Sequence, residues 1–313
     1  MISIIIPTYN RAKDLQKALE SVLEQSYTDY EVLVIDNGPS TDNTRQVTES
    51  FTDKRIRYIA TDLKGCIFAR NIGAGAAKGE ILLTLDDDIE FIKGNELAKL
   101  VETYKGDKKI GIVGSIELVS PNEILRKSAV TLPPDIGRVS GKGDFNTSFN
   151  LIEGHGITEV DHVRSAFMSI KRDLFHDVGR FDEIYNARGL GFRYESDLCF
   201  KVMEAGYKVV LNPEIKIWHK GAKRARGFRR GAGLSYYYYA NRNHVYFMNR
   251  FFWHGNMGGF LRDLLWGTYR TPGIGICIER AFTERNTSFI VNAFSSAAGK
   301  IAGYRRWHSS EDR

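Results

Sequence analysis

Alternation of strand-like and helix-like segments is the feature of this 313-residue chain that most restricts its fold. Residues 2–6 form an isoleucine-rich run that ends at Pro7, a pattern typical of a buried strand. Further strands are expected at 31–35, 55–59, 81–85 and 110–118, and helices at 15–23, around 47–51, at 67–77 and at 97–104. Repeated βα units predict an α/β fold with a mostly parallel central sheet flanked by helices.

The second half of the chain is less regular. Residues 120–160 are rich in Pro, Gly, Ser and Asn. After them, strands are expected at 166–170, 207–211 and 215–219, and a helix at 197–205. We therefore expect one domain at 1–219, with halves at about 1–118 and 119–219. A basic, aromatic and mainly helical region is expected at 220–313.

Charge is unevenly distributed along the chain. Residues 220–313 contain 16 Lys and Arg against 5 Asp and Glu, a balance of +11, whereas the whole chain carries only +6. The basic residues Arg224, Arg226, Arg229 and Arg230 precede the aromatic groups Tyr236–Tyr239, Phe251–Trp253 and Trp266. This combination favours contact with an anionic membrane, and the alternative is a helical subdomain that packs on the core.

Cysteine content and the N-terminus bear on the compartment. Three cysteines without metal-ligand spacing exclude a disulfide scaffold and a zinc ribbon. The first residues lack the features of a signal peptide, and no apolar run reaches about 18 residues. We expect a cytoplasmic protein, with peripheral attachment to the inner face of the cell membrane as the consequence of the basic region.

Polar residues follow the expected strands, where open α/β sheets bind ligands. The first strand leads into Pro7–Arg11, the second into Asp36–Gly38, and the fourth into Asp86–Asp88. Three consecutive carboxylates repel one another unless a cation offsets them, and hard divalent ions prefer carboxylate oxygens. The triplet therefore indicates a metal site, with a solvated acidic turn as the alternative.

Two common phosphate-binding motifs are absent from the sequence. The turn after the first strand has no glycine, and Gly73-Ala-Gly75 continues without the rest of a dinucleotide or P-loop pattern. We expect these two glycines to allow close helix packing or a turn.

Several segments, in order and with suitable spacing, resemble the family 2 glycosyltransferases. They are Ser3–Arg11, Val34–Asp42, Ala69–Gly73, Gly79–Glu80, Leu85–Asp88, Val178–Glu183, Tyr194–Leu198, Gly206–Tyr207 and Trp218–His219. The resemblance covers about the first 220 residues. It implies a GT-A fold, inversion at the anomeric carbon, a nucleotide-diphosphate-sugar donor, a divalent metal (Mn²⁺ or Mg²⁺) and a sugar or lipid-linked acceptor. The half at 1–118 would bind the donor and the half at 119–219 the acceptor.

The resemblance also implies roles for individual residues. Asp36 would contact the base or ribose and Asp86 the nucleotide-sugar, while Asn37 stands where the family usually has a second acidic residue. The other donor-side residues would be Pro7, Thr8, Asn10, Arg11, Lys64, Arg70 and Asp87, with Lys64 and Arg70 at the diphosphate. Asp88 and His219 would bind the metal.

The acceptor side is expected around Glu195. This residue would be the general base, placed just before a helix that Ser196 caps. Asp197 would lie on the acceptor side or stabilise the first turn of that helix as a cap, and the cap is favoured.

Two other functions compete with glycosyl transfer. A sugar nucleotidyltransferase shares an α/β sheet and metal carboxylates, but its usual glycine-rich basic loop after the first strand is missing. A nucleic-acid-binding protein would explain the basic region but not the carboxylates, so no nucleic-acid partner is expected. Arg305-Arg-Trp307 partly matches a motif of processive synthases, but Gly303 replaces its glutamine, and a processive polymerase is rejected.

Overall fold

The structure, a computed structural model, describes residues 1–38, 40–118, 134–187, 190–221 and 233–311. The chain forms two compact units. The α/β unit consists of Met1–Arg138, Asn146–Gly189 and Tyr194–Ala222, and the helical unit of Val139–Phe145, Leu190–Arg193 and Lys223–Arg313. Two short segments that the sequence analysis assigned to the first domain thus belong to the helical unit.

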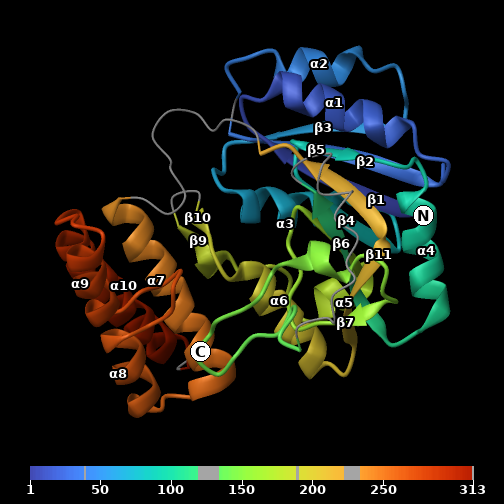
Figure 1. The fold of residues 1–313 in the computed structure, drawn as a ribbon. Helices are drawn as coiled ribbons and strands as arrows, with labels where there is room; N and C mark the ends of the chain where they lie inside the picture. The colour runs from blue at the N-terminus through green and yellow to red at the C-terminus, as the bar shows by residue number, and fades with distance from the viewer. Residues whose placement is uncertain (39, 119–133, 188–189, 222–232, 312–313) are drawn as a thin grey trace. The chain divides into compact units, whose positions relative to one another are not determined.

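The α/β unit contains the expected succession of strands and helices (Figure 1). Its strands are β1 (Ile2–Thr8), β2 (Tyr30–Asn37), β3 (Ile56–Thr61), β4 (Ile81–Leu85), β5 (Ile89–Phe91), β6 (Ile110–Leu118), β7 (Thr158–Glu159), β8 (Phe167–Lys171), β9 (Asn186–Ala187) and β11 (Lys208–His219). Its helices are α1 (Ala12–Leu23), α2 (Thr44–Ser50), α3 (Cys66–Ala76), α4 (Glu96–Gly106), α5 (Arg172–Asp177) and α6 (Tyr194–Glu204), with short 3₁₀ turns at Phe149–Ile152 and Glu183–Tyr185.

The central sheet is mixed but mostly parallel. Its strand order is β3-β2-β1-β4-β8-β6-β11-β5, with β7 beside β11. β8 runs antiparallel between β4 and β6, and β5 runs antiparallel to the end of β11. The carboxyl ends of β1, β2, β4, β6 and β11 therefore lie along one edge of the sheet.

Strand β11 differs from the sequence prediction. Residues 207–211 and 215–219 were expected to form two strands because Asn212 and Pro213 interrupt the apolar pattern. The structure has one strand, and a register shift against β6 between Leu211 and Lys216 absorbs the interruption. Strand β5 was not expected, because its three residues are too few to show a periodicity.

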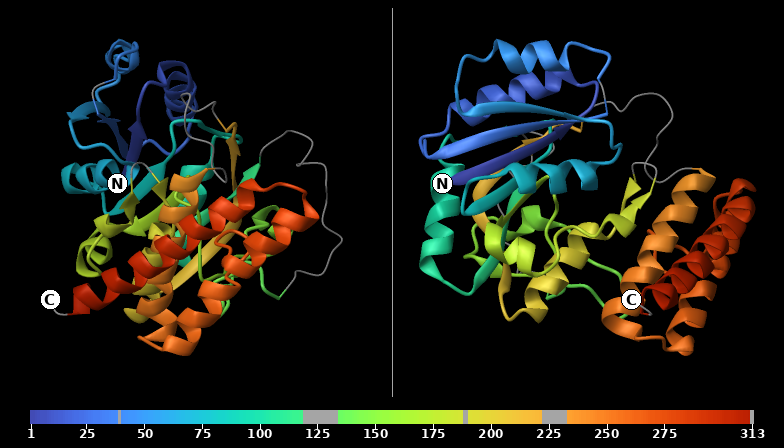
Figure 2. Two further views of the ribbon diagram at one scale, coloured as in Figure 1. Left: turned by 90° about the vertical axis from the view of Figure 1, so that its left-hand side faces the viewer. Right: turned by 180° about the vertical axis from the view of Figure 1, so that it is seen from behind.

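Alternate residues of the central strands face different helices. Ile2, Ile4 and Ile6 of β1 share one core with α1 and α4. Ile5 points the other way, toward α3, where it meets Gly73. Figures 1 and 2 show α1 and α2 on one face of the sheet and α3 on the other. Because helices cover both faces of the sheet, side chains on both sides of the central strands are buried. The strands are therefore apolar at nearly every position, as in other parallel sheets.

In its described residues, the helical unit contains four α-helices and a short strand, β10 (Leu190–Gly191). The helices are α7 (Leu234–Met248), which continues as a π-helix at Asn249–Trp253, α8 (Met257–Leu265), α9 (Ile274–Thr283) and α10 (Ser288–Glu311). Glycine lets α10 approach α7 closely. A Cβ on Gly299 would lie 2.1 Å from the Tyr238 carbonyl oxygen, and one on Gly303 would lie 2.3 Å from that of Arg242.

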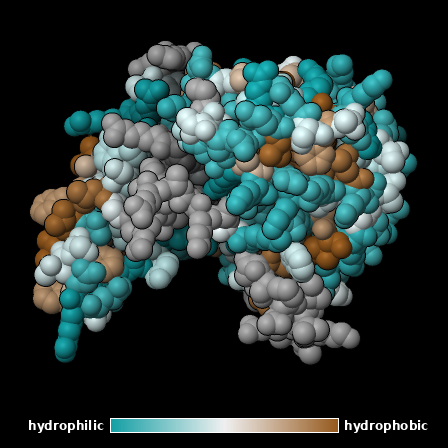
Figure 3. All heavy atoms as spheres, turned by 90° about the horizontal axis from the view of Figure 1, so that it is seen from above, coloured by the Kyte–Doolittle hydropathy of each residue, from teal (hydrophilic) through white to brown (hydrophobic). Residues whose placement is uncertain are grey.

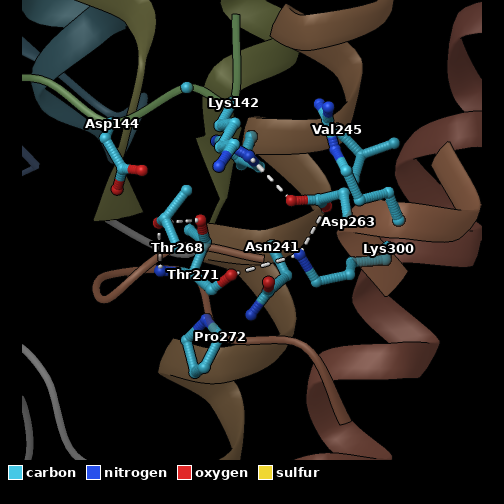
Figure 4. A network of polar contacts seen from close by, with 12 residues as sticks. Lys142, Asp144, Asn241, Val245, Asp263, Thr268, Thr271, Pro272 and Lys300 are labelled. Carbon is cyan, nitrogen blue, oxygen red and sulfur yellow. Dashed lines mark hydrogen bonds and ion pairs between the residues drawn. The ribbon is translucent and has the colours of Figure 1, made fainter. Parts of the chain in front are cut away.

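A buried network of charged side chains holds the helical unit together. Lys300 of α10 lies between the Asp263 carboxylate, at 2.5 Å, and the Thr271 carbonyl oxygen, at 3.1 Å (Figure 4). The other Asp263 oxygen is 3.3 Å from Nε2 of His244, whose Nδ1 contacts Arg193 at 3.1 Å. Burial alone would raise the pKa of Asp263, but the charge of Lys300 and the hydrogen bonds from His244 and Lys300 lower it to about 2. The network therefore holds an ionised carboxylate inside the unit.

The aromatic and basic residues of this region do not all lie where the sequence suggested. Arg224, Arg226, Arg229 and Arg230 fall outside the described residues. Trp253 and Tyr237 are buried, so they belong to the core and not to a membrane interface. Trp266 is 58% exposed.

Within the described residues, no helix combines the length and the apolar character needed to cross a lipid bilayer.

Gly73 and Gly75 offer a direct test of helix packing on the sheet. A Cβ on Gly73 would lie 2.4 Å from Ile5 Cγ2, whereas a Cβ on Gly75 would meet nothing within 4 Å. We expect Gly73→Ala to lower the free energy of unfolding by about 1–3 kcal/mol, because the tightly packed interface must deform. Gly75→Ala, in the same helix, should raise it by about 0.5–1 kcal/mol. Chemical denaturation of both variants measures the difference, and equal stabilities would contradict this packing.

Candidate active site

The carboxyl edge of the sheet gathers most of the polar residues that the sequence analysis selected. β1 ends at Thr8, β2 at Asn37, β4 leads into Asp86, and β11 ends at His219. β2, β1 and β4 are neighbours in the sheet, and β8 and β6 lie between β4 and β11. Strand β5, which follows Asp86–Asp88, pairs with the end of β11. The site is therefore assembled from segments far apart in the sequence.

Asp87, the middle carboxylate of the triplet, faces the interior. Only 4% of the residue is exposed, and its oxygens accept hydrogen bonds from Thr8 Oγ1 at 2.8 Å and from Arg11 at 2.7 Å. Burial raises the pKa of Asp87 to about 7, although Arg11 opposes the shift. The structure thus shows Asp87 engaged with the β1 end, and its side chain fixes Thr8 and Arg11.

Asp86 and Asp88 flank Asp87 and lie close to His219. One ligand atom from each of the three residues lies within 4.8 Å of the others, and no other such group of acidic, histidine or cysteine residues occurs in the described ranges. His219 Nε2 is 3.5 Å from Asp88 Oδ1. Two carboxylates and one imidazole suit Mn²⁺ and also Mg²⁺, which takes mainly oxygen ligands. The donor set therefore fits the expected metal.

Glu117 orients His219, and the sequence analysis did not select it. Its Oε2 is 3.0 Å from His219 Nδ1 and also 3.0 Å from Arg164. Burial would lower the pKa of His219, but Glu117 and the nearby aspartates raise it above its ordinary value. A carboxylate on Nδ1 directs Nε2 toward Asp88, as is usual for metal-binding histidines. In the sequence, Glu117 could have been recognised as a candidate because it is an acidic residue within an otherwise apolar predicted strand at 110–118.

The β2 end holds Asp36 in a polar cage. Its carboxylate accepts from Ser40 Oγ at 2.7 Å and from the Tyr58 hydroxyl at 2.6 Å. Burial and the hydrogen bond to Asp36 raise the pKa of Tyr58, which keeps it a donor. Asn37, the departure from the family pattern, accepts a hydrogen bond from the backbone N–H of Gly65 at 2.7 Å.

The remaining donor-side residues lie around these groups. Pro7 is buried within β1 and pairs with Ile35 of β2. Asn10 adopts a positive φ of 52°, and its Oδ1 accepts from the Thr41 N–H at 2.6 Å, which links the loops after β1 and β2. Lys64 lies next to Gly38, because a Cβ on that glycine would be 3.2 Å from Lys64 Cγ.

Arg70 connects the acidic turn to the start of α6. It is buried in α3, pairs with Asp86 at 2.5 Å and lies 5.7 Å from the centre of the Tyr194 ring. Burial alone would lower the pKa of Arg70, but Tyr194 and Asp86 are foremost among the groups that raise it. Arg70 therefore contacts Asp86 and lies near the first residue of α6.

Helix α6 begins earlier than predicted. Tyr194 is its first residue, so Glu195 lies in the first turn and Ser196 is inside the helix, where its hydroxyl contacts His162 at 3.1 Å. The expected Ser196 cap is wrong, because this side chain is buried and engaged elsewhere. Glu195 Oε1 accepts a hydrogen bond from Ser165 at 3.1 Å, and Ser165 also bonds the Tyr194 hydroxyl.

Asp197 occupies an interior position. Its side chain is fully buried, pairs with Lys201 at 2.9 Å and accepts a hydrogen bond from the Tyr185 hydroxyl at 3.1 Å. This arrangement does not fit the predicted position on the acceptor side, because no part of the side chain reaches the surface. Asp197 does lie in the first helical turn, but its partners are side chains of the core and not solvent.

Comparison with known proteins identifies the family of this chain. Residues 3–179 match the sequence profile described as glycosyl transferase family 2. The chain belongs to that family. This membership favours a glycosyltransferase over the two competing functions considered from the sequence.

Two curated relatives illustrate the range of the family. WfgD of Escherichia coli, a UDP-Glc:α-D-GlcNAc-diphosphoundecaprenol β-1,3-glucosyltransferase, is 33% identical over 41% of this chain and 50% of its own. A glucosyl-dolichyl phosphate glucuronosyltransferase of Haloferax volcanii is 25% identical over 70% of this chain and 69% of its own. The chain spans about half the length of several curated relatives that it matches.

A solved structure confirms the predicted fold class of this family member. The mannosyltransferase PcManGT of Pyrobaculum calidifontis, solved with GDP-Man and Mn²⁺, superposes with a TM-score of 0.55. The match covers 99% of this chain and 87% of the other, with 17% sequence identity. The α/β fold is of the GT-A type, with helices added at the C-terminal end.

The structural role of Asp197 predicts the effect of removing its partner. Lys201→Met leaves a fully buried carboxylate without its cation, and we expect a loss of about 3–5 kcal/mol in the free energy of unfolding. Lys208→Met is the matched control, since Lys208 pairs with Asp107 at 2.9 Å while 46% of its side chain is exposed. That change should cost no more than about 0.5 kcal/mol. Denaturant titrations measure the free energy of unfolding of both variants. If Lys201→Met loses as little stability as Lys208→Met, the structural role of Asp197 is contradicted.

Proposed function

We propose that this chain is an inverting glycosyltransferase that moves a sugar from a nucleotide-diphosphate-sugar to an acceptor hydroxyl, in glycan, polysaccharide or glycolipid assembly. The observation that carries the proposal is the cluster of Asp86, Asp88 and His219, which lies at the carboxyl edge of the sheet in a chain whose residues 3–179 match the family 2 profile. Arg70 pairs with Asp86 and lies near Tyr194, the residue before the proposed general base.

The donor would bind along the carboxyl edge of the sheet. Asp36 would accept hydrogen bonds from the base or ribose, and Asn10 and Arg11 would border the nucleotide from the β1 end. Arg70 and Lys64 would contact the diphosphate, Arg as a bidentate donor and Lys as a point charge. Asp86 would contact the nucleotide-sugar, so its present ion pair with Arg70 would have to rearrange when the donor binds.

A divalent cation, Mn²⁺ or Mg²⁺, would be held by Asp88 and His219, with Asp86 beside them. The support is the donor set of this chain, together with the Mn²⁺ in the structure of the mannosyltransferase PcManGT. When bound, such an ion supplies positive charge to the departing diphosphate. Glu117 would contribute by holding His219 in the required orientation.

Glu195 would act as the general base. An inverting transfer needs one carboxylate to accept the proton of the acceptor hydroxyl while the sugar is displaced from the opposite face. The hydrogen bond from Ser165 fixes one Glu195 oxygen. No covalent intermediate with the enzyme is required.

A lipid-linked acceptor fits best among the acceptors that the sequence left open. The names of both relatives described above contain polyprenyl carriers, diphosphoundecaprenol and dolichyl phosphate. The excess of basic residues after residue 219 is consistent with peripheral contact with an anionic membrane at the cytoplasmic face.

The metal assignment is tested by titrating the protein with Mn²⁺ alone. Asp88→Ala should lower Mn²⁺ affinity by at least about tenfold, and His219→Ala by about 10- to 100-fold, because each removes a proposed ligand. Asp173→Ala is the control, since the Asp173 side chain is 86% exposed and lies outside the cluster. Binding measured by calorimetry gives the affinities, and full activity of Asp88→Ala with saturating Mn²⁺ would overturn the assignment.

The general base is tested by Glu195→Gln, which keeps the shape of the side chain but removes its basicity. Turnover should fall by roughly 10²- to 10⁴-fold, while donor affinity changes little. Asp197→Asn is the informative comparison, because it should act mainly by lowering stability. If Asp197→Asn reduces turnover more than Glu195→Gln in protein that remains folded, the assignment of the base is wrong.

A further inference from the structure

The outer surface of α9 carries large apolar side chains that the core does not use. Ile278 is 43% exposed and Phe282, one turn later, is 76% exposed. The opposite side of the same helix contributes the fully buried Cys277 to a small core with Tyr237 and Ala293. An ordinary surface helix is polar on its outward face, so apolar residues on both sides of α9 indicate a second contact surface.

Helix α10 continues this apolar surface. Ile290 and Val291, in its first turn, are 45% and 52% exposed, and Phe294 is 74% exposed. Only Glu284–Thr287 separate α9 from α10, so the exposed end of α9 and the start of α10 are adjacent. In Figure 3, brown and tan spheres gather on the helical unit at its left-hand edge.

Tyr269 extends the surface from the loop before α9. It is 80% exposed, and the Arg280 guanidinium lies 4.3 Å from the centre of its ring. Arg280 also donates a hydrogen bond to the Tyr269 carbonyl oxygen at 3.2 Å, which ties this loop to α9. We call the six residues Tyr269, Ile278, Phe282, Ile290, Val291 and Phe294 the hairpin patch.

The charge of the helical unit as a whole distinguishes between partners. Within residues 233–310, the exposed cationic side chains are Arg262, Arg270, Arg285, Arg305 and Arg306, whereas the exposed acidic ones are Glu279 and Glu284. A surface of phenylalanine, isoleucine and tyrosine on a unit with an excess of exposed arginines matches a lipid bilayer, whose interior is apolar and whose headgroups are anionic. The same excess of positive charge disfavours the approach of a second copy of the unit.

We propose that the hairpin patch inserts into the headgroup region of an anionic membrane and holds the helical unit on it. The proposal deepens the proposed function by naming the surface that brings the enzyme to a lipid-linked acceptor. Phe282 and Phe294 are the anchors, because burying a phenylalanine contributes about 1.5–3 kcal/mol and the two phenylalanines of the patch are 76% and 74% exposed. The arginines add an attraction that salt screens.

The experiment measures binding of the full chain to vesicles without donor or acceptor, so its result is independent of transfer activity. Vesicles of phosphatidylcholine alone and with phosphatidylglycerol are sedimented with the parent protein at low and high salt. The test variant combines Phe282→Ser and Phe294→Ser. The control combines Leu63→Ser and Ile157→Ser, two apolar residues of the α/β unit that are 52% and 51% exposed.

We expect the parent and the control to bind phosphatidylglycerol vesicles equally, more strongly at low salt. The test variant should bind at least about tenfold more weakly while keeping the helix content and unfolding midpoint of the parent, since its altered side chains are mostly exposed. All variants retain residues 222–232, so the basic segment cannot account for a difference between them. Equal vesicle binding by test variant and control would overturn the proposal. So would a parent that ignores vesicles but sediments as a dimer that the test variant abolishes, because the patch would then cover a second copy of the chain.

Discussion

Repulsion among three consecutive carboxylates is the constraint on which the site depends. Asp86, Asp87 and Asp88 follow β4 without an intervening residue, and each lies beside a basic side chain from a different element. Arg70 comes from α3, Arg11 from the β1 end and His219 from the β11 end. The surroundings of the turn therefore require α3, β1 and β11 to be in place, so the folded sheet and the charge balance of the site support each other.

The three carboxylates have different surroundings and therefore different roles. Asp87 points inward, where Thr8 and Arg11 hold it. Asp86 is 31% exposed and Asp88 is buried, and both lie with His219. Burial raises the pKa of Asp87 to about 7, although Arg11 opposes the shift. The inward carboxylate is thus tied to the β1 end, and the two carboxylates beside His219 are the ones that fit a cation.

Local patterns predicted most of the α/β unit, and long-range contacts account for the errors. The βα succession and the polar strand ends follow from periodicities within a few residues, which a single sequence displays. The start of α6 was misplaced because Ser196 looks like a cap, yet its hydroxyl bonds His162, a partner 34 residues away. The burial of Asp197 depends in the same way on Tyr185, and the orientation of His219 on Glu117. None of these partners is recognisable before the sheet topology is known.

The helical unit shows why residue type alone could not locate its surface. Lysine and aspartate are the residues expected outside, yet Lys300 and Asp263 are buried as a pair. Tryptophan and tyrosine suggested an interface, yet Trp253 and Tyr237 fill the core while Phe282 and Phe294 lie outside. Glycine at 299 and 303 brings α10 against α7, so the face of α10 that meets α7 needs no large side chains there. The large apolar residues in the first turns of α10, such as Phe294, therefore lie on the surface of the unit. Which of them are exposed becomes known only once the packing of the helices is known.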